Sequence, residues 1–149
     1  MARLDAARVA AWRELQSVSA ELERAIDAEL VAEWEIPLGW FDVLAALQRL
    51  GGVARPHELA VELRLVRSSL SRRLDRLEEE GWVARHRTGP AIGDNDHRAV
   101  DVELTRRGRT LWREMNVTYR RAVQSLVASK LADADVAALR RVLATVAPP

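Results

Sequence analysis

The segment from Arg67 to Arg76 carries the residue types with the clearest chemical use in this chain. Small hydroxyl side chains let a helix approach a groove closely, and guanidinium forks suit the oxygens of phosphate or guanine. The candidate DNA contacts are therefore its serines and arginines: Arg67, Ser68, Ser69, Ser71, Arg72, Arg73 and Arg76. The alternative is a solvated helix face, and the acidic run Glu78–Glu80 is most simply a solvated helix end.

A polar hairpin is predicted after this segment. Residues 82–87 alternate apolar and polar side chains, as a strand does, and residues 98–104 are typical of a returning strand. Residues 88–95 contain Gly89-Pro90 and Gly93, which is the composition of a loop. An arginine at such a tip can enter a narrow minor groove, so Arg87 and Arg98 join the candidate contacts.

The other reactive side chains form no pattern that supports catalysis. His57, His86 and His97 are predicted on different elements, lack a helical i,i+4 pairing or a partnering carboxylate at metal spacing, and are expected to be solvated. No Ser-His-Asp order, glycine-rich phosphate loop or paired-carboxylate site stands out. The chain has no cysteine, which excludes disulfides and thiolate zinc sites. We expect a protein that is not an enzyme and uses no cofactor or metal.

Size and charge are those of a single globular domain. The chain has 149 residues, of which 48% are hydrophobic and 30% are charged. Its net charge is only +1, but residues 64–109 hold 11 arginines against 8 acidic residues, a local net of +3. Any nucleic-acid surface must therefore be arranged locally. With no signal-peptide segment and no apolar run of about 20 residues, the protein is expected to be cytoplasmic and not to span a membrane.

Six helices are predicted, at residues 5–33, 40–50, 56–64, 66–80, 106 to about 130, and from Asp133 or Asp135 onward. The first has an apolar stripe that runs from Val9 to Leu30 and is long for so small a protein. It is either a core helix or a helix that contacts a partner. Two long amphipathic ends around a compact centre suggest dimerisation through the termini.

Four motifs in this order resemble the MarR (multiple antibiotic resistance regulator) family of bacterial transcription regulators. They are Ser69-Leu70-Ser71-Arg72, Leu77-Glu78-Glu79-Glu80-Gly81-Trp82-Val83-Ala84-Arg85, Asp96-His97-Arg98 and Leu104-Thr105-Arg106-Arg107-Gly108. Residues 37–44 also resemble the second helix of many members. The resemblance implies a mainly α fold with a small β-wing (α+β), a winged helix-turn-helix that forms a homodimer through its N- and C-terminal helices.

The resemblance also implies how the chain is divided. Residues 1–149 would be one MarR-type domain, with dimerisation helices at 1–35 and 106–147 and a DNA-binding lobe at 40–105. The fourth helix would enter the major groove and the wing would touch the minor groove. Asp96 would hold an arginine of the recognition region, while Arg98 reaches the minor groove.

Two features depart from the family pattern. The wing is longer than usual, since 11 positions separate Arg85 from Asp96. Arg73 occupies a position that is usually apolar, so it is expected to bend out to a phosphate or to pair with a glutamate on a neighbouring turn.

The function implied by the resemblance is a regulator, expected to be a repressor, that leaves a pseudo-palindromic operator when a small, often aromatic acid binds. Such a ligand would lie between the dimer helices and the DNA lobe, where Trp12, Trp40 and Trp112 are expected; the alternative is that these tryptophans are core residues. A different class of function stays open, because the modest local charge and the acidic helix end also allow a winged-helix protein-interaction module that does not read DNA.

Overall fold

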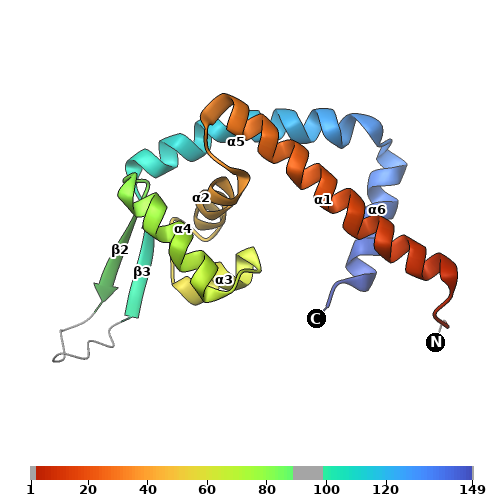
Figure 1. The fold of residues 1–149 in the computed structure, drawn as a ribbon, viewed down its shortest axis with the longest axis horizontal. Helices are drawn as coiled ribbons and strands as arrows, with labels where there is room; N and C mark the ends of the chain where they lie inside the picture. Colours follow the sequence, from red (N-terminus) through yellow and green to blue (C-terminus); the bar gives the residue numbers. More distant parts are fainter. Residues whose placement is uncertain (1–2, 89–98, 149) are drawn as a thin grey trace.

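A computed structural model describes residues 3–88 and 99–148 of the chain. Two long helices, α1 (Ala6–Trp34) and α5 (Arg106–Leu126), pack against each other and support a smaller lobe (Figure 1). The lobe contains α2 (Leu38–Arg49), α3 (Pro56–Leu63), α4 (Arg67–Glu79) and a β-hairpin. The predicted fold class, mainly helical with a small wing, is confirmed.

Most boundaries lie close to their predicted positions, with two differences. The second helix begins at Leu38 rather than Trp40, because Pro37 supplies the extended residue just before it. The fifth helix ends at Leu126 instead of continuing to about residue 130, and a short 3-10 turn, η1 (Ala128–Lys130), precedes α6 (Asp133–Val146).

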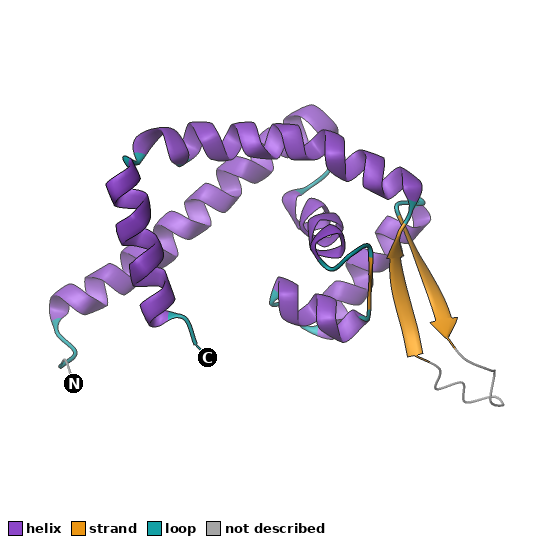
Figure 2. Ribbon diagram, turned by 180° about the vertical axis from the view of Figure 1, so that it is seen from behind, coloured by secondary structure: helices purple, strands orange, loops and turns teal. Residues whose placement is uncertain are grey.

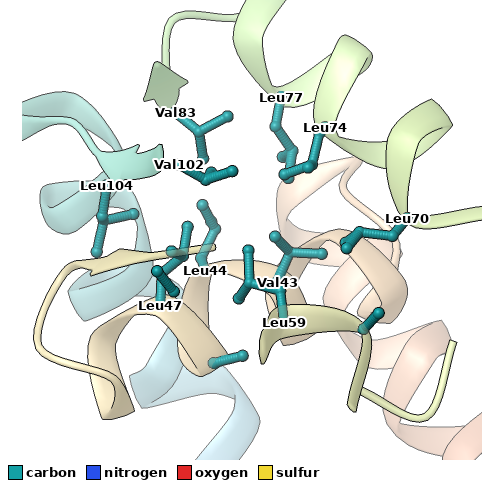
Figure 3. Close-up of a cluster of buried hydrophobic side chains, with 13 residues drawn as sticks. Val43, Leu44, Leu47, Leu59, Leu70, Leu74, Leu77, Val83, Val102 and Leu104 are labelled. Carbon is teal, nitrogen blue, oxygen red and sulfur yellow. The ribbon is translucent and has the colours of Figure 1, made fainter. Parts of the chain in front are cut away.

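The helix-turn-helix consists of α3, a tight turn and α4. Arg64 ends α3 in a left-handed conformation (φ 53°), and the amide of Leu65 donates to the carbonyl of Ala60 at 3.0 Å. Leu70, Leu74 and Leu77 lie on the inner face of α4 and are buried in the lobe core (Figure 3). Full burial of a leucine contributes about 1.5–3 kcal/mol. The apolar side therefore determines which face of α4 remains outside.

The wing is part of a three-stranded antiparallel sheet with the order β1-β3-β2. Strands β2 (Val83–Thr88) and β3 (Ala99–Leu104) pair along their whole described length, from Val83 opposite Leu104 to Thr88 opposite Ala99, and β1 (Val53–Ala54) pairs with β3 on the other side. Figure 2 shows the hairpin projecting from the lobe.

The base of the wing is closely packed against α5. Thr105 caps α5 by accepting from the Gly108 amide at 3.0 Å, and its hydroxyl donates to the Gly81 carbonyl at 2.7 Å. A Cβ at Gly108 would lie only 1.9 Å from the carbonyl oxygen of Trp82. The Leu-Thr-x-x-Gly motif is therefore a packing requirement at this junction.

A second core joins α1, α2 and α5. It is built from apolar residues of all three helices and their connections: Ile26, Leu30, Ile36, Phe41, Ala45, Met115 and Ala122. The indole of Trp34 donates to the Thr118 hydroxyl at 2.9 Å, and the Asp27 carboxylate accepts from the Leu38 amide at 2.7 Å. These contacts fix the lobe to the long helices.

The two ends of the chain are left uncovered in a single copy. Every residue of α6 is exposed, and so is α1 from Ala6 to Glu21 apart from the half-buried Val9. The apolar stripe predicted for the first helix is therefore buried only near its C-terminal end, at Ile26 and Leu30. Within residues 3–88 and 99–148, no helix combines the length and apolar character needed to cross a membrane.

Candidate DNA interface

The outer face of α4 presents the predicted hydroxyl and guanidinium groups. Five of the seven candidates on this segment are exposed: Arg67, Ser68, Ser71, Arg72 and Arg76. Ser69 and Arg73 are half-buried. The helix begins at Arg67, so its serines lie in the first two turns, where a helix entering a groove first meets the bases.

A groove separates α4 from the wing. It has a volume of about 600 Å³ and is lined by Arg67, Ser68 and Ser71 of α4 on one side and by Arg85, His86 and Arg87 of β2 on the other. Leu70, Leu74 and Val100 lie between them. Arg87 is exposed and pairs across the sheet with Val100. The groove thus has polar and basic walls over an apolar floor.

Arg85 connects the two walls of this groove and was not predicted as a site residue. Its backbone amide donates to Glu78 Oε2 at 2.8 Å, and its Nη2 donates to Asp75 Oδ1 at 2.6 Å and to Glu78 Oε1 at 3.1 Å. The guanidinium of Arg85 holds the pKa of Glu78 below its ordinary value. Glu79 and Glu80 are exposed, as expected of a solvated helix end, but Glu78 is half-buried and its carboxylate is bound to β2.

Arg73 points toward α2. Its Nη1 donates to the carbonyl oxygen of Gly39 at 3.0 Å, in place of the expected glutamate on a neighbouring turn. Burial raises the pKa of the nearby Asp42 carboxyl, and the charge of Arg73 acts in the opposite direction. Arg73, Gly39 and Asp42 together link α4 to the beginning of α2. The sequence could not predict this link, because the family pattern has an apolar residue at the position of Arg73 and so indicates no polar partner.

The wing-tip candidates Asp96 and Arg98, with His97, lie outside the described residues. Of the predicted minor-groove arginines, only Arg87 therefore has a described position, on β2.

The three candidate ligand-binding tryptophans lie in two different settings. Trp40 and Trp112 are half-buried and pack against both cores, and Trp40 also meets Trp82 edge-on at 6.2 Å between ring centroids. Trp12 is 59% exposed on the uncovered part of α1. It belongs to neither core cluster.

A crevice of about 540 Å³ lies between α1 and the smaller lobe, but no tryptophan lines it. Its lining is mostly polar and includes Glu23, Arg24, Asp27, Asp42 and Arg73, with Leu38, Leu63 and Leu65 among the apolar residues. A ligand in this crevice would meet two guanidinium groups and three carboxylates rather than aromatic rings.

Two of the three histidines, His57 and His86, lie within the described residues. The Nε2 of His86 lies 2.9 Å from Glu103 Oε2 across the hairpin. Among the described parts of the chain, no group of three or more His, Cys, Asp or Glu side chains could hold a metal ion.

Comparisons with known proteins agree with this geometry. A sequence model described as MarR family matches residues 34–91. The HTH-type transcriptional regulator PecS of Dickeya dadantii (strain 3937) is 35% identical over 96 residues, which is 63% of this chain and 54% of PecS. The chain thus matches about half the length of this curated relative.

Two solved structures resemble nearly the whole chain. Sco3205, a MarR family regulator from Streptomyces coelicolor in complex with DNA, is 26% identical, with a TM-score of 0.82 over 98% of this chain and 89% of its own. A cysteine-to-serine variant of MarR from E. coli complexed with operator DNA is 28% identical, with a TM-score of 0.78 over 99% of this chain and 100% of its own. In sequence over residues 34–91, and in fold over nearly its whole length, the chain is similar to MarR family transcriptional regulators.

Proposed function

We propose that this protein is a homodimeric repressor that binds a pseudo-palindromic operator through α4 and the wing. The observation that carries the proposal is the outer face of α4, where exposed serines and arginines border a basic groove beside β2. Guanidinium groups and small hydroxyls are the side chains that contact phosphates and base edges. The two similar structures that contain DNA support this reading.

On this proposal, each side chain has a defined part. Ser68, Ser71 and Arg72 face the bases and phosphates of the major groove, with Arg67 and Arg76 on the flanks and Ser69 beside them. In the wing, Arg87 and Arg98 would contact the minor groove, and Asp96 would hold an arginine of the recognition region. Arg73, which bonds to Gly39 in the free protein, supports α4 from behind.

The dimer would form through the two uncovered ends. A 14-residue helix such as α6 is marginal in water unless its apolar face is packed. That face, Val136, Leu139, Val142 and Leu143, is exposed, as are Trp12, Leu15 and Val18 of α1. Residues 1–35 and 106–147 would thus pair two copies and leave residues 40–105 free as DNA-binding lobes. Two recognition helices would then meet half-sites one helical turn apart, about 10 bp.

A small ligand would bind in the polar crevice between α1 and the lobe, and its binding would release the DNA from α4 and the wing. A ligand changes the DNA-bound fraction only if it binds one arrangement of the lobes better than the other. Arg73 gives such a ligand a route to α4, because this arginine lines the crevice and bonds to Gly39. An acid, aromatic or not, would compete for the Arg73 guanidinium. Trp40 lies closest to this region, because it follows Gly39 of the crevice in sequence and shares a second pocket with Arg73.

A mobility shift with the DNA upstream of the protein's own gene tests the proposal. We expect a complex at low salt whose affinity falls steeply as salt rises. The absence of any complex at low salt would overturn the proposal and favour a protein-interaction module. Thermal melting with a panel of small acids tests the ligand, because a compound that binds the folded state raises the melting temperature.

A further inference from the structure

Three side chains hold the wing against the recognition helix. Arg85 of β2 bonds to Asp75 and to Glu78, which lie one turn apart near the C-terminal end of α4. The Arg85 side chain is 28% exposed and both of its carboxylate partners are more exposed, so the group lies at the surface of the groove. We call Asp75, Glu78 and Arg85 the α4–β2 clamp.

The position of β2 in the sheet explains why this clamp is more than a surface ion pair. In the order β1-β3-β2, strand β2 is at the edge, and no strand among the described residues lies along its other side. The amide of Arg85 would be left without a strand partner on that side, but it donates to Glu78 Oε2 at 2.8 Å. One carboxylate therefore binds both the backbone and the guanidinium of the same residue, which fixes the strand and its side chain together.

The clamp joins the two surfaces that the DNA would touch at once. One wall of the groove is α4, with Ser68 and Ser71, and the other is β2, with Arg87. If the angle between the walls changes, either the helix or the wing no longer reaches the DNA. A residue that fixes this angle contributes to affinity without touching the DNA.

We propose that Asp75, Glu78 and Arg85 are positioning residues that set the angle between recognition helix and wing. The proposal rests on the proposed function, because it concerns DNA binding by this surface. It assigns a role to acidic residues on a face that meets polyanionic DNA. Simple electrostatics predicts that an acid on such a face weakens binding, and so that its removal strengthens binding.

The direction in which the operator Kd changes when a carboxylate is neutralised distinguishes a positioning role from simple electrostatic repulsion. Asp75→Asn and Glu78→Gln each remove one negative charge, and so does Glu79→Gln, the matched control. Glu79 pairs with Arg76 at 3.4 Å, both are exposed, and neither belongs to the clamp. We expect Asp75→Asn and Glu78→Gln to raise the operator Kd about threefold to tenfold. Glu79→Gln should leave the Kd unchanged or lower it.

The salt dependence of binding gives a second readout. Because the clamp contacts no phosphate, the slope of log Kd against log salt should be the same in the clamp variants and the wild type. Arg85→Lys keeps the charge but loses the fork, and it should weaken operator binding like the carboxylate variants. Melting temperatures identify any variant that fails to fold, in which case the remaining clamp variants carry the test.

If the clamp variants bind the operator as tightly as Glu79→Gln does, or show a shallower salt slope than the wild type, the proposed positioning role of the clamp is overturned. Failure of the wild type to bind DNA would instead overturn the proposed function. The two failures are therefore distinguishable within one titration series.

Discussion

The guanidinium of Arg73 lies directly against the backbone of Gly39. The two are joined by a hydrogen bond of 3.0 Å from Nη1 to the carbonyl oxygen, and a Cβ at Gly39 would lie 3.0 Å from the Arg73 Cζ. The glycine leaves the space that the arginine occupies. Helix α4 is thereby joined to the start of α2, next to Asp42 and the polar crevice.

Replacing Arg73 should raise the pKa of Asp42. Burial raises this pKa above the ordinary 3.8, and the nearby positive charge of Arg73 lowers it. In Arg73→Met the burial remains and the charge is removed, so the carboxyl should titrate at higher pH in an NMR titration. Arg49→Met is the control, since Arg49 is a weaker influence on the same carboxyl. An unchanged or lower pKa in Arg73→Met would contradict the link.

The same shift has a defined consequence for stability. The folded state of the wild type binds the Asp42 proton more tightly than the unfolded state does, because the carboxyl has its ordinary pKa of 3.8 when the chain is unfolded. Asp42 therefore contributes stability below that value, and the contribution is lost as pH rises through the folded pKa. In Arg73→Met the loss should extend to higher pH, which urea unfolding at a series of pH values measures.

Gly108→Ala should strongly destabilise the protein. The added Cβ would lie 1.9 Å from the Trp82 carbonyl oxygen, and backbone atoms can yield only by shifting the wing or α5. Overpacking of this kind costs about 3 kcal/mol, which lowers Tm by roughly 5–10 °C. Thr110→Ala, on the exposed side of the same helix, should change Tm little. Equal melting temperatures for Gly108→Ala and the wild type would contradict the packing.

Much of the lobe could be predicted from local sequence. Helical spacing placed Leu70, Leu74 and Leu77 on the inner face of α4, and the exposed serines follow from that placement. Gly81 and Thr105 marked the ends of α4 and the start of α5 because caps depend on nearby backbone.

Contacts between distant segments could not be predicted in this way. An apolar stripe such as Trp12 and Leu15 has the same spacing whether its own chain or a second copy covers it. Likewise, the partners of Arg73 and Glu78 lie on other elements, and only the folded chain shows that Gly39 and Arg85 meet them.

The stabilising effect of Glu78 should depend on pH in the opposite sense from that of Asp42. Hydrogen bonds from Arg85 lower its folded pKa below the ordinary 4.5. Its contribution is thus fully present above that value and is lost as pH falls through the folded pKa. The difference in unfolding free energy between wild type and Glu78→Gln should shrink as the pH is lowered below about 4.5. If this difference in unfolding free energy stays constant down to about pH 2, the stabilising role of the ionised Glu78 carboxylate is contradicted.

A charge on the apolar face of α6 should separate the dimer. Leu139 lies on the same exposed face as Val136, Val142 and Leu143. Leu139→Glu should shift the mass measured by light scattering from dimer toward monomer, because a carboxylate would be buried between two copies. Ala137→Glu adds the same charge on the opposite face of the helix and should leave the dimer intact. A wild type that is monomeric would contradict the proposed assembly.

The most direct test measures DNA affinity against salt for Arg72→Ala. Arg72 is exposed on the outer face of α4, and Arg113, exposed on α5, is the matched control for removal of one charge. We expect Arg72→Ala to weaken operator binding without unfolding the protein, with a log–log salt slope shallower by roughly 0.9 for each phosphate that the variant no longer neutralises. Arg113→Ala should keep the wild-type slope. If Arg72→Ala binds the operator with the affinity and slope of the wild type, the outer face of α4 is not the DNA-binding surface.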